Sequence, residues 1–234
     1  MATIINLTEK WLACGGTIPI FPLPDTVLLP QEVVPLHIFE PRYRRMLNDV
    51  ISSERLLGMA LLKPGWEADY DTKSAAVYEQ ICVGYVAADQ LLPDGRSLII
   101  LQGVSRAEIE KELATNEPYR LTRCRLIADR QLNEPSIDRE HRHRELVFRY
   151  LQLLPKLNLA ETGMVPTERH DLSLGALCDL LASTLSLTAD DKLSVLQEVD
   201  VDERSELVLQ LIKQRLRLER ETAKIEFPPP FSEN

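Results

Sequence analysis

The hydrophobic period of this chain changes once, near residue 130, and this change most limits the folds open to it. Up to Asp129 the sequence consists of short apolar or alternating runs separated by Pro and Gly, the pattern of strands. After Pro135 the apolar residues recur at helical spacing. The chain is therefore expected to be an α+β protein, with strands first, helices second and a domain boundary near residue 130.

The first part is predicted to contain six strands and one helix. The strands cover residues 17–23, 27–29, 56–63, 77–88, 97–104 and 119–127, which indicates a sheet or a barrel. Pro93 and Gly95 suit a tight reversal, so the strands on either side of them are expected to form a hairpin. Pro41 suits a first helical turn, and this helix is expected to plug one end of the barrel. Its apolar face is formed by Tyr43, Met46, Leu47, Val50 and Ile51.

The second part is predicted to be helical throughout. Two amphipathic stripes run through residues 146–154 and 174–185, and a last helix covers about 202–224. Thr188 and Asp191 have the spacing of a capping box, in which each side chain accepts a hydrogen bond from an exposed backbone N–H. A short helix is therefore expected to begin after Thr188.

The charge balance disfavours nucleic acid and anionic membranes as partners, and the cysteine usage favours a reducing compartment. The chain has 27 basic and 36 acidic residues, a net charge of -9, which gives no general attraction to phosphate backbones or anionic lipids. The four cysteines form no closely spaced pair, which fits a reducing compartment. No apolar run reaches the roughly 18 to 20 residues that span a bilayer, and residues 1–16 are expected to be a tail without the features of a signal peptide. A cytoplasmic protein without membrane contact is predicted.

A search for catalytic chemistry finds no candidate residues. No phosphate-binding Gly-rich motif precedes a Lys, and no serine lies in a nucleophile elbow. His141 and His143 would diverge by about 200° on a helix, so they cannot share one metal ion. His37 lies near the carboxylate of Glu40, which could form an acid–base pair with it, but it is expected to be structural. No catalytic, cofactor-binding or metal-binding residue is predicted.

One group of arginines is the only candidate for binding nucleic acid. Neighbouring acidic residues dilute it, and apart from Tyr119 and Phe148 it lacks interleaved aromatic residues for stacking on bases. A salt-bridge network between the two parts of the chain is the alternative, and the sequence favours it. The arginines are Arg120, Arg123, Arg125, Arg130, Arg139, Arg142, Arg144 and Arg149.

Two stretches near the N-terminus resemble a known family. Residues 18–30 read IPIFPLPDTVLLP and residues 34–43 read VPLHIFEPRY, and both are similar to the opening of the Lon N-terminal domain family. Later segments continue the likeness over about residues 17–222: VGYV at 83–86, LPDG at 92–95, LQGV at 101–104, DLLASTL at 179–185, KLSVL at 192–196 and VDER at 201–204.

The resemblance implies a fold and a role. The fold would be a PUA-like β-barrel with the plugging helix, followed by an α-helical bundle, over 17–130 and 131–225, with tails at 1–16 and 226–234. It also implies a strand through 106–113, where the local pattern favours a helix. The chain would be a stand-alone, non-catalytic module without ATPase or peptidase domains. It would recognise unfolded or exposed apolar polypeptide, or act as an adaptor to a protease or another partner; RNA binding is the alternative, and the oligomeric state is left open.

Four aromatic residues are the candidates for contact with a protein partner, because exposed aromatic side chains anchor interfaces. Phe39 and Tyr43 could serve in this way, although their positions fit the core better. Trp66 and Tyr70 lie in the polar stretch 64–74, where an exposed loop is expected. For this pair, contact and packing are equally favoured.

Overall fold

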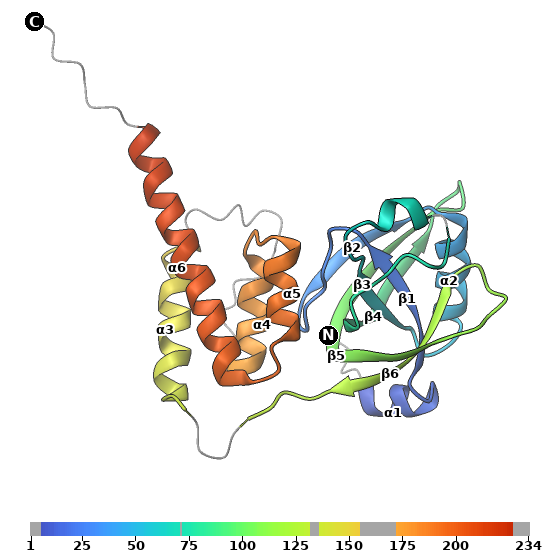
Figure 1. Cartoon of the computed structure of the whole chain (residues 1–234), viewed down its shortest axis with the longest axis horizontal. Coiled ribbons are helices and arrows are strands. Elements are labelled where there is room, and N and C mark those ends of the chain that lie inside the picture. The colour runs from blue at the N-terminus through green and yellow to red at the C-terminus, as the bar shows by residue number, and fades with distance from the viewer. Residues whose placement is uncertain (1–5, 71, 132–135, 155–171, 227–234) are drawn as a thin grey trace, which may run out of the picture.

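A computed structural model describes residues 6–70, 72–131, 136–154 and 172–226, the last seven of these as backbone alone. Strands fill the first part of the chain and helices the second, which confirms the α+β prediction, and Figure 1 shows the two parts side by side. The predicted C-terminal tail lies outside the described residues except for Glu226, which ends the last helix.

The strands form one sheet whose pairings close on themselves. β1 pairs with β3 and β6, β3 with β4, β4 with β5, and β5 with β6, while β2 pairs with β5 alone among the described residues. Only the β1–β3 pair is parallel. The strands are β1 (Thr17–Leu23), β2 (Val33–Ile38), β3 (Leu56–Leu61), β4 (Gln80–Leu91), β5 (Ser97–Leu113) and β6 (Arg120–Ile127).

Strand β5 is long enough to pair with three neighbours. It continues through residues 106–113, where the local pattern alone favoured a helix. Its first part pairs with β2 and β4, and residues 106–113 pair with β6. The strand expected from the resemblance is therefore confirmed. The pairing with β6 satisfies the backbone over 106–113, so a weak local helical pattern does not decide its structure.

Residues 27–29 do not form the predicted strand. Val27, Leu28 and Leu29 bury their side chains in the core, but none of them belongs to a ladder. The chain turns at Gln31, which has a φ of 72°, and enters β2 from there. At this crossing a Cβ on Gly103 would lie 2.1 Å from the Leu29 carbonyl oxygen, so only glycine fits. The run is apolar because its side chains are buried in the core, and this made it resemble a strand although its backbone joins no ladder.

The N-terminal segment contains a helix where a tail was predicted. α1 (Leu7–Ala13) is capped by the Asn6 side chain, which accepts a hydrogen bond from the Glu9 N–H at 3.2 Å. Leu7 and Trp11 pack against a small core cluster formed by β1, β3, β4, β5 and β6. This packing stabilises a helix that would be too short to persist alone.

The helix predicted after Pro41 is confirmed as α2 (Pro41–Ile51). It buries Tyr43, Met46, Leu47 and Val50 as expected. In Figure 1 it lies on the side of the strands away from the helical part. A short 3₁₀ helix, η1 (Trp66–Asp69), occupies the region that the sequence predicted as an exposed loop.

The helical part consists of α3 (Arg139–Leu151), α4 (Leu174–Thr184), α5 (Ala189–Gln197) and α6 (Val201–Glu226). α6 packs against α3, α4 and α5, and α5 also contacts β4. Thr188 caps α5 by accepting a hydrogen bond from the Asp191 N–H at 3.1 Å. The Asp191 carboxylate accepts from the Thr188 hydroxyl and not from a backbone donor, so only half of the predicted capping box forms.

The main hydrophobic cluster runs through both parts of the chain. It joins residues of α2 and the strands, such as Leu47 and Leu101, to helical residues such as Leu196 and Ile212. The backbone of Arg130 also pairs with the segment before α6, donating to the Val199 carbonyl at 2.8 Å and accepting from the Val201 N–H at 3.0 Å. The domain boundary near residue 130 stays a prediction, because this core is shared.

Candidate functional site

The outer face of β2, β4 and β5 carries the largest group of exposed apolar side chains in the described part of the chain. In the part of the chain that the structure describes, nine large apolar side chains are strongly exposed, and four of them lie on this face. They are Val33 (49%), Phe39 (58%), Leu98 (44%) and Ile100 (38%). Leu91 of β4 is also exposed, but it lies opposite Ser97 and so on the side of the sheet that Ile99 occupies. Exposed apolar groups gathered in this way mark interaction surfaces in soluble proteins.

The alternation of β5 explains how this face arises. Ile99 and Leu101 point into the core and are 2% and 0% exposed, while Leu98 and Ile100 point outward. An antiparallel strand with one solvated face normally carries polar residues there. The continuous apolar run at 98–101 was the available signal for this surface, and sequence analysis did not use it.

A cleft of about 550 Å³ lies on this face. The register places the outward residues Pro35 opposite Ile100 and His37 opposite Leu98. On the other side of β5, Ala88 also lies opposite Ile100. The cleft is thus lined mainly by apolar side chains from three adjacent strands, with His37, Asp89 and Gln90 as its polar members. Its size and lining suit one or a few apolar side chains of a ligand.

The structure brings together three of the four predicted contact residues. The Trp66 and Tyr70 rings meet edge to face with centroids 5.1 Å apart. The Arg42 guanidinium lies 4.8 Å from the Tyr70 ring and 4.7 Å from the Tyr43 ring. Phe39 stands apart from this row, with its exposed ring 5.9 Å from His37 beside the apolar face.

These aromatic residues differ in their availability to a partner. Tyr43 is 4% exposed and belongs to the core, the position that the sequence favoured for it. Trp66 and Tyr70 are half-buried and pack on each other. Burial raises the pKa of Tyr43 to about 12, and burial together with the hydrogen bond to Glu40 raises the pKa of Tyr70. Both hydroxyls therefore stay protonated at neutral pH.

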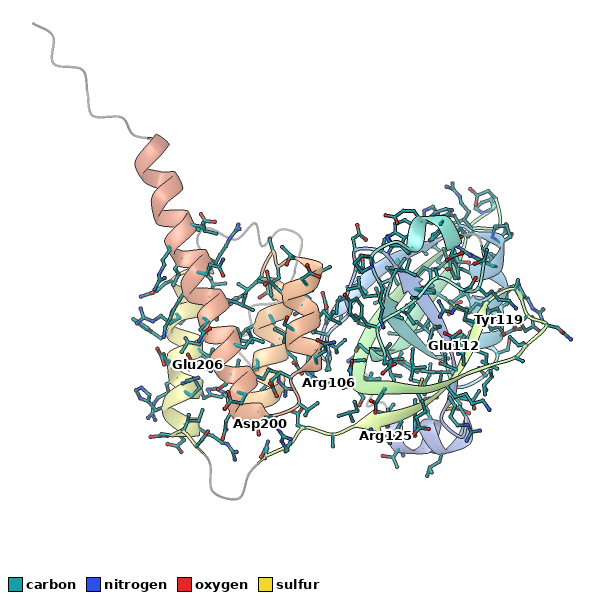
Figure 2. The ribbon with its side chains drawn as sticks, viewed as in Figure 1. Arg106, Glu112, Tyr119, Arg125, Asp200 and Glu206 are labelled. Carbon is teal, nitrogen blue, oxygen red and sulfur yellow. The ribbon has the colours of Figure 1, made fainter. Side chains whose placement is uncertain are left out.

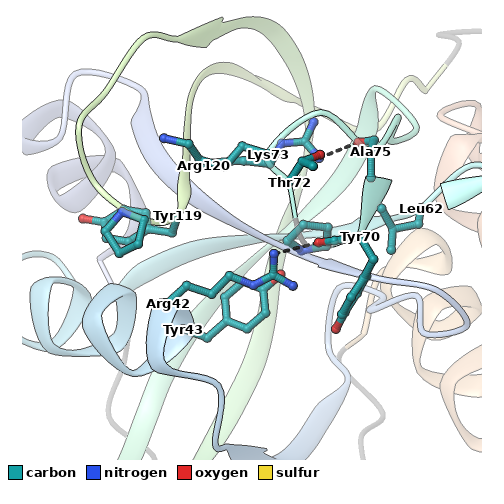
Figure 3. Close-up of a pocket in the computed structure, with 11 residues that line it drawn as sticks. Arg42, Tyr43, Leu62, Tyr70, Thr72, Lys73, Ala75, Tyr119 and Arg120 are labelled. Carbon is teal, nitrogen blue, oxygen red and sulfur yellow. Dashed lines mark hydrogen bonds between the residues drawn. The ribbon is translucent and has the colours of Figure 1, made fainter. Parts of the chain in front are cut away.

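A small cavity lies beside Tyr43 and Tyr70 (Figure 3). Its cationic lining residues are engaged by the protein itself: Arg42 donates to the Tyr70 carbonyl at 2.8 Å, Arg120 to the Ala75 carbonyl at 2.7 Å. The cavity volume is about 10 Å³, enough for about one water molecule. This cavity is a packing feature and does not accommodate a ligand.

A cluster of four charges joins the strands to the helices, and the sequence predictions did not include it. Three of the charges are buried, and the fourth, Asp129, is 31% exposed. Arg106 of β5 makes two hydrogen bonds to Asp179 of α4, at 2.6 and 2.7 Å, and both side chains are under 5% exposed. Arg204 of α6 donates to Asp129 at 2.6 Å. Figure 2 shows Arg106 at the junction of the two parts. A Cβ on Gly175 would lie 2.2 Å from an Asp129 oxygen, so glycine lets α4 approach this cluster.

The two charge pairs of the cluster cancel, which is how Arg106, Asp179 and Arg204 can be buried. Burial raises the pKa of Asp179, against the opposing effect of the hydrogen bonds from Arg106. The only sequence signal was the position of Asp179 and Arg204 in segments that resemble the Lon family. Separated by more than 70 residues along the chain, Arg106 and Asp179 could not be paired from the sequence.

Most arginines of the candidate nucleic-acid patch are paired with carboxylates. Two pairs lie within the strands, three link the region after β6 and α3 to the start of α6, and one lies within α3; Figure 2 labels one member of several of them. These contacts occupy most of the arginines, but only Arg130–Asp200 links the two parts, so most of the pairs are not the network between the parts that the sequence favoured. They are Arg120–Glu112, Arg125–Glu108, Arg130–Asp200 (3.2 Å), Arg139–Asp202 (2.7 Å), Arg142–Glu206 (2.7 Å) and Arg144–Glu140 (3.6 Å).

The described residues contain no group of three or more His, Cys, Asp or Glu side chains that could hold a metal ion. The cysteines are free thiols, and burial raises the pKa of Cys124 to about 11 and that of Cys178 to about 12. In the same part of the chain, no helix has the length and apolar character needed to cross a bilayer.

The fold matches solved Lon N-terminal domains. One is the Lon N-terminal domain protein from Xanthomonas campestris, with a TM-score of 0.59 at 21% identity, covering 83% of this chain and 97% of that one. Another is the N-terminal domain of the Mycobacterium avium complex Lon protease, with a TM-score of 0.59 at 17% identity, covering 84% and 98%. At these identities the likeness establishes the fold.

The sequence establishes the family. Residues 17–214 match the family described as the ATP-dependent protease La (LON) substrate-binding domain, so the chain belongs to that family. Relatives include Lon protease of Rhizobium meliloti, 28% identical over 83% of this chain, and Lon protease 2 of Sorangium cellulosum, 27% identical over 88%. The chain spans about a quarter of the length of these proteases: 24% and 26%.

Proposed function

We propose that this chain is a non-catalytic protein-binding module that takes up exposed apolar segments of unfolded polypeptides, in the cytoplasm, for a protease or another partner that it serves as an adaptor. Family membership supports a substrate-binding role. The closed strand pairings would then be the PUA-like barrel and α3 to α6 the helical bundle, each as the Lon likeness implies.

The observation that carries the proposal is the apolar outer face of β2, β4 and β5. Leu98 and Ile100 remain exposed at the centre of a cleft of about 550 Å³, between Pro35 on one side and Ala88 on the other. Leaving apolar side chains in water forgoes about 25 cal/mol for each Å² that could be buried. A ligand that covers this face recovers that free energy, and an unfolded chain offers the apolar side chains to do so.

RNA binding receives no support from the charges at the surface. Most of the arginines that could contact phosphates are engaged by carboxylates, as Arg130 is by Asp200 and Arg139 by Asp202. The protein as a whole carries a net charge of -9. RNA would have to displace these ion pairs and overcome that repulsion.

The proposal is tested by the binding of a permanently unfolded protein, reduced and carboxymethylated α-lactalbumin, measured by fluorescence anisotropy. The double variant L98D/I100D is expected to bind at least about tenfold more weakly, because it places two charges at the centre of the contact. L12D is the matched control, since Leu12 is an exposed leucine on α1. Equal binding by L98D/I100D and the unmodified protein would remove this face from the account.

The predicted aromatic contacts are tested in the same assay. Phe39→Ala is expected to weaken binding, because Phe39 lies next to β2 and is 58% exposed. Trp66→Ala and Tyr70→Ala measure whether the second aromatic group contributes. A parallel titration with single-stranded RNA separates the alternative: tight binding that weakens steeply with salt would favour RNA over the protein ligand.

A further inference from the structure

The free edge of β2 offers backbone hydrogen-bonding groups as well as apolar side chains. β2 is the terminal strand in the order of the sheet and, among the described residues, pairs only with β5. Along an antiparallel strand, the N–H and C=O of one residue point to one neighbour and those of the next residue point the other way. Which residues face outward can therefore be worked out from two contacts.

Glu32 and Pro35 show which residues of β2 direct their backbone groups toward β5 and which direct them toward the free edge. The Glu32 carbonyl accepts from the Gly103 N–H at 2.8 Å, so this carbonyl faces β5 and the backbone groups of Val33 face away. Pro35 has no N–H to give to β5, which agrees with an outward direction. Val33, Pro35 and His37 thus direct their backbone groups to the free edge.

This edge presents two donors and three acceptors. The donors are the N–H groups of Val33 and His37, and the acceptors are the carbonyls of Val33, Pro35 and His37. Within the described part of the chain, no hydrogen bond to these groups is found outside the β2–β5 ladder. The side chains of the same three residues are exposed and border the apolar face. Backbone and side chains together match an extended peptide.

Pro35 distinguishes a foreign strand from a second copy of this chain. If two β2 edges paired symmetrically about Pro35, the two carbonyls would face each other with no donor between them. A shifted pairing that still includes Pro35 of both copies lacks two donors, whereas a foreign strand without proline loses only one hydrogen bond. Pro35 therefore limits self-pairing, as edge prolines do, and leaves five groups for another chain.

We propose that an extended apolar segment of a polypeptide adds to the free edge of β2 as a further strand, with alternate side chains leaning over the cleft beside Pro35, His37, Leu98 and Ile100. The inference rests on the proposed function and specifies its ligand. The segment spans at least the length of Val33 to His37 and is apolar at every second residue. It has no proline at the residue that donates to the Pro35 carbonyl.

The test uses a fluorescent synthetic peptide of about nine residues, in which valine and threonine alternate. Single backbone N-methyl groups remove one donor at a time. In strand addition only every second amide faces β2, so methylation is expected to weaken binding about three- to tenfold at alternate positions and to have no effect between them. Sensitive valine amides would indicate an antiparallel strand, and sensitive threonine amides a parallel one. Equal sensitivity at all positions, or none, overturns the inference.

The variant P35V is the test on the protein side. It restores the missing donor while keeping an apolar side chain, so it is expected to bind the peptide about two- to tenfold more tightly. It is also expected to self-associate in sedimentation experiments, unlike the unmodified protein. Unchanged affinity and no self-association would contradict strand addition. Strand addition would also be contradicted if the unmodified protein forms a dimer in which a second copy already pairs with the β2 edge.

The L98D/I100D variant separates this inference from the proposed function. Lost binding by that variant, without alternation in the N-methyl series and without a gain in P35V, keeps the apolar face as the binding site and rejects the added strand. No loss in L98D/I100D rejects the proposed function itself.

Discussion

Replacing Asp179 by Asn should uncouple the strands from the helices. The change leaves the volume of the side chain almost unaltered but gives the charge cluster a net charge of +1, since Arg106, Arg204 and Asp129 remain. Removing one partner of a buried ion pair costs about 3–5 kcal/mol, because the other charge stays buried. Arg106 and Asp179 are 4% and 3% exposed, so solvent screens them little.

The assay is urea unfolding followed by tryptophan fluorescence and by circular dichroism, with the free energy of unfolding obtained by linear extrapolation. D179N is expected to lose about 3–5 kcal/mol. If the junction opens before the rest, the two signals will no longer coincide. D94N is the matched control and should change nothing measurable, because the Asp94–Arg96 pair is exposed.

A second variant separates charge from packing. The pair R106M/D179L removes both charges and leaves Arg204 with Asp129. It should recover part of the loss, because a buried pair can often be replaced by apolar residues. Recovery is incomplete, since the Val195 and Leu196 carbonyls lose the 3.0 Å hydrogen bonds that they accept from Arg106. A loss under about 1 kcal/mol in D179N would refute the argument that this cluster holds the two parts together.

Three further predictions follow from other contacts. Hydrogen bonds from Arg139 hold the pKa of Asp202 below its usual value of about 3.9. Above about pH 3.9 this ionised carboxylate therefore stabilises the folded state. Its contribution is lost as the pH falls through the lower pKa that Asp202 has in the folded state. The stability difference between the unmodified protein and D202N, from urea midpoints at pH 7, 5 and 3, should therefore shrink below about pH 4, and a constant difference would contradict it. G103A should lower stability by about 1–3 kcal/mol because its Cβ meets the Leu29 carbonyl; a melting temperature within about 1 °C of the unmodified protein would be the contrary result. A thiol reagent should modify one cysteine fast and three slowly, since only Cys14 is not fully buried, and C14S should abolish the fast phase.

Local patterns were reliable where one element was decided by its own residues. Pro41 predicted the start of α2, and the predicted apolar face extends to Ile51, where the helix ends. Residues 17–23 coincide with β1. The run 27–29 misled, because its side chains are buried by a crossing over Gly103 and not by a ladder. α1 was missed for the opposite reason, since its packing on the small core cluster depends on distant strands.

The candidate site, too, was predictable from local sequence only in part. Trp66 and Tyr70 could be named from their polar surroundings, yet only the structure shows that they pack on each other with Arg42 against the Tyr70 ring. Leu98 and Ile100 could have been recognised from the apolar run at 98–101, but that run does not reveal which neighbours complete the surface. Pro35 and Ala88 lie beside Ile100 because of strand register, which depends on pairing between distant segments.

The sequence by itself determined the α+β class, the order of strands before helices, and the family, because periodicity and short motifs are properties of neighbouring residues. The tertiary structure alone decided that β2 ends the sheet with a free edge and that its neighbours form an apolar cleft. It also decided that Arg106 meets Asp179 at the junction. The physical reason is that register, edges and buried charge pairs arise when segments far apart in the chain come together, and their energies depend on that arrangement.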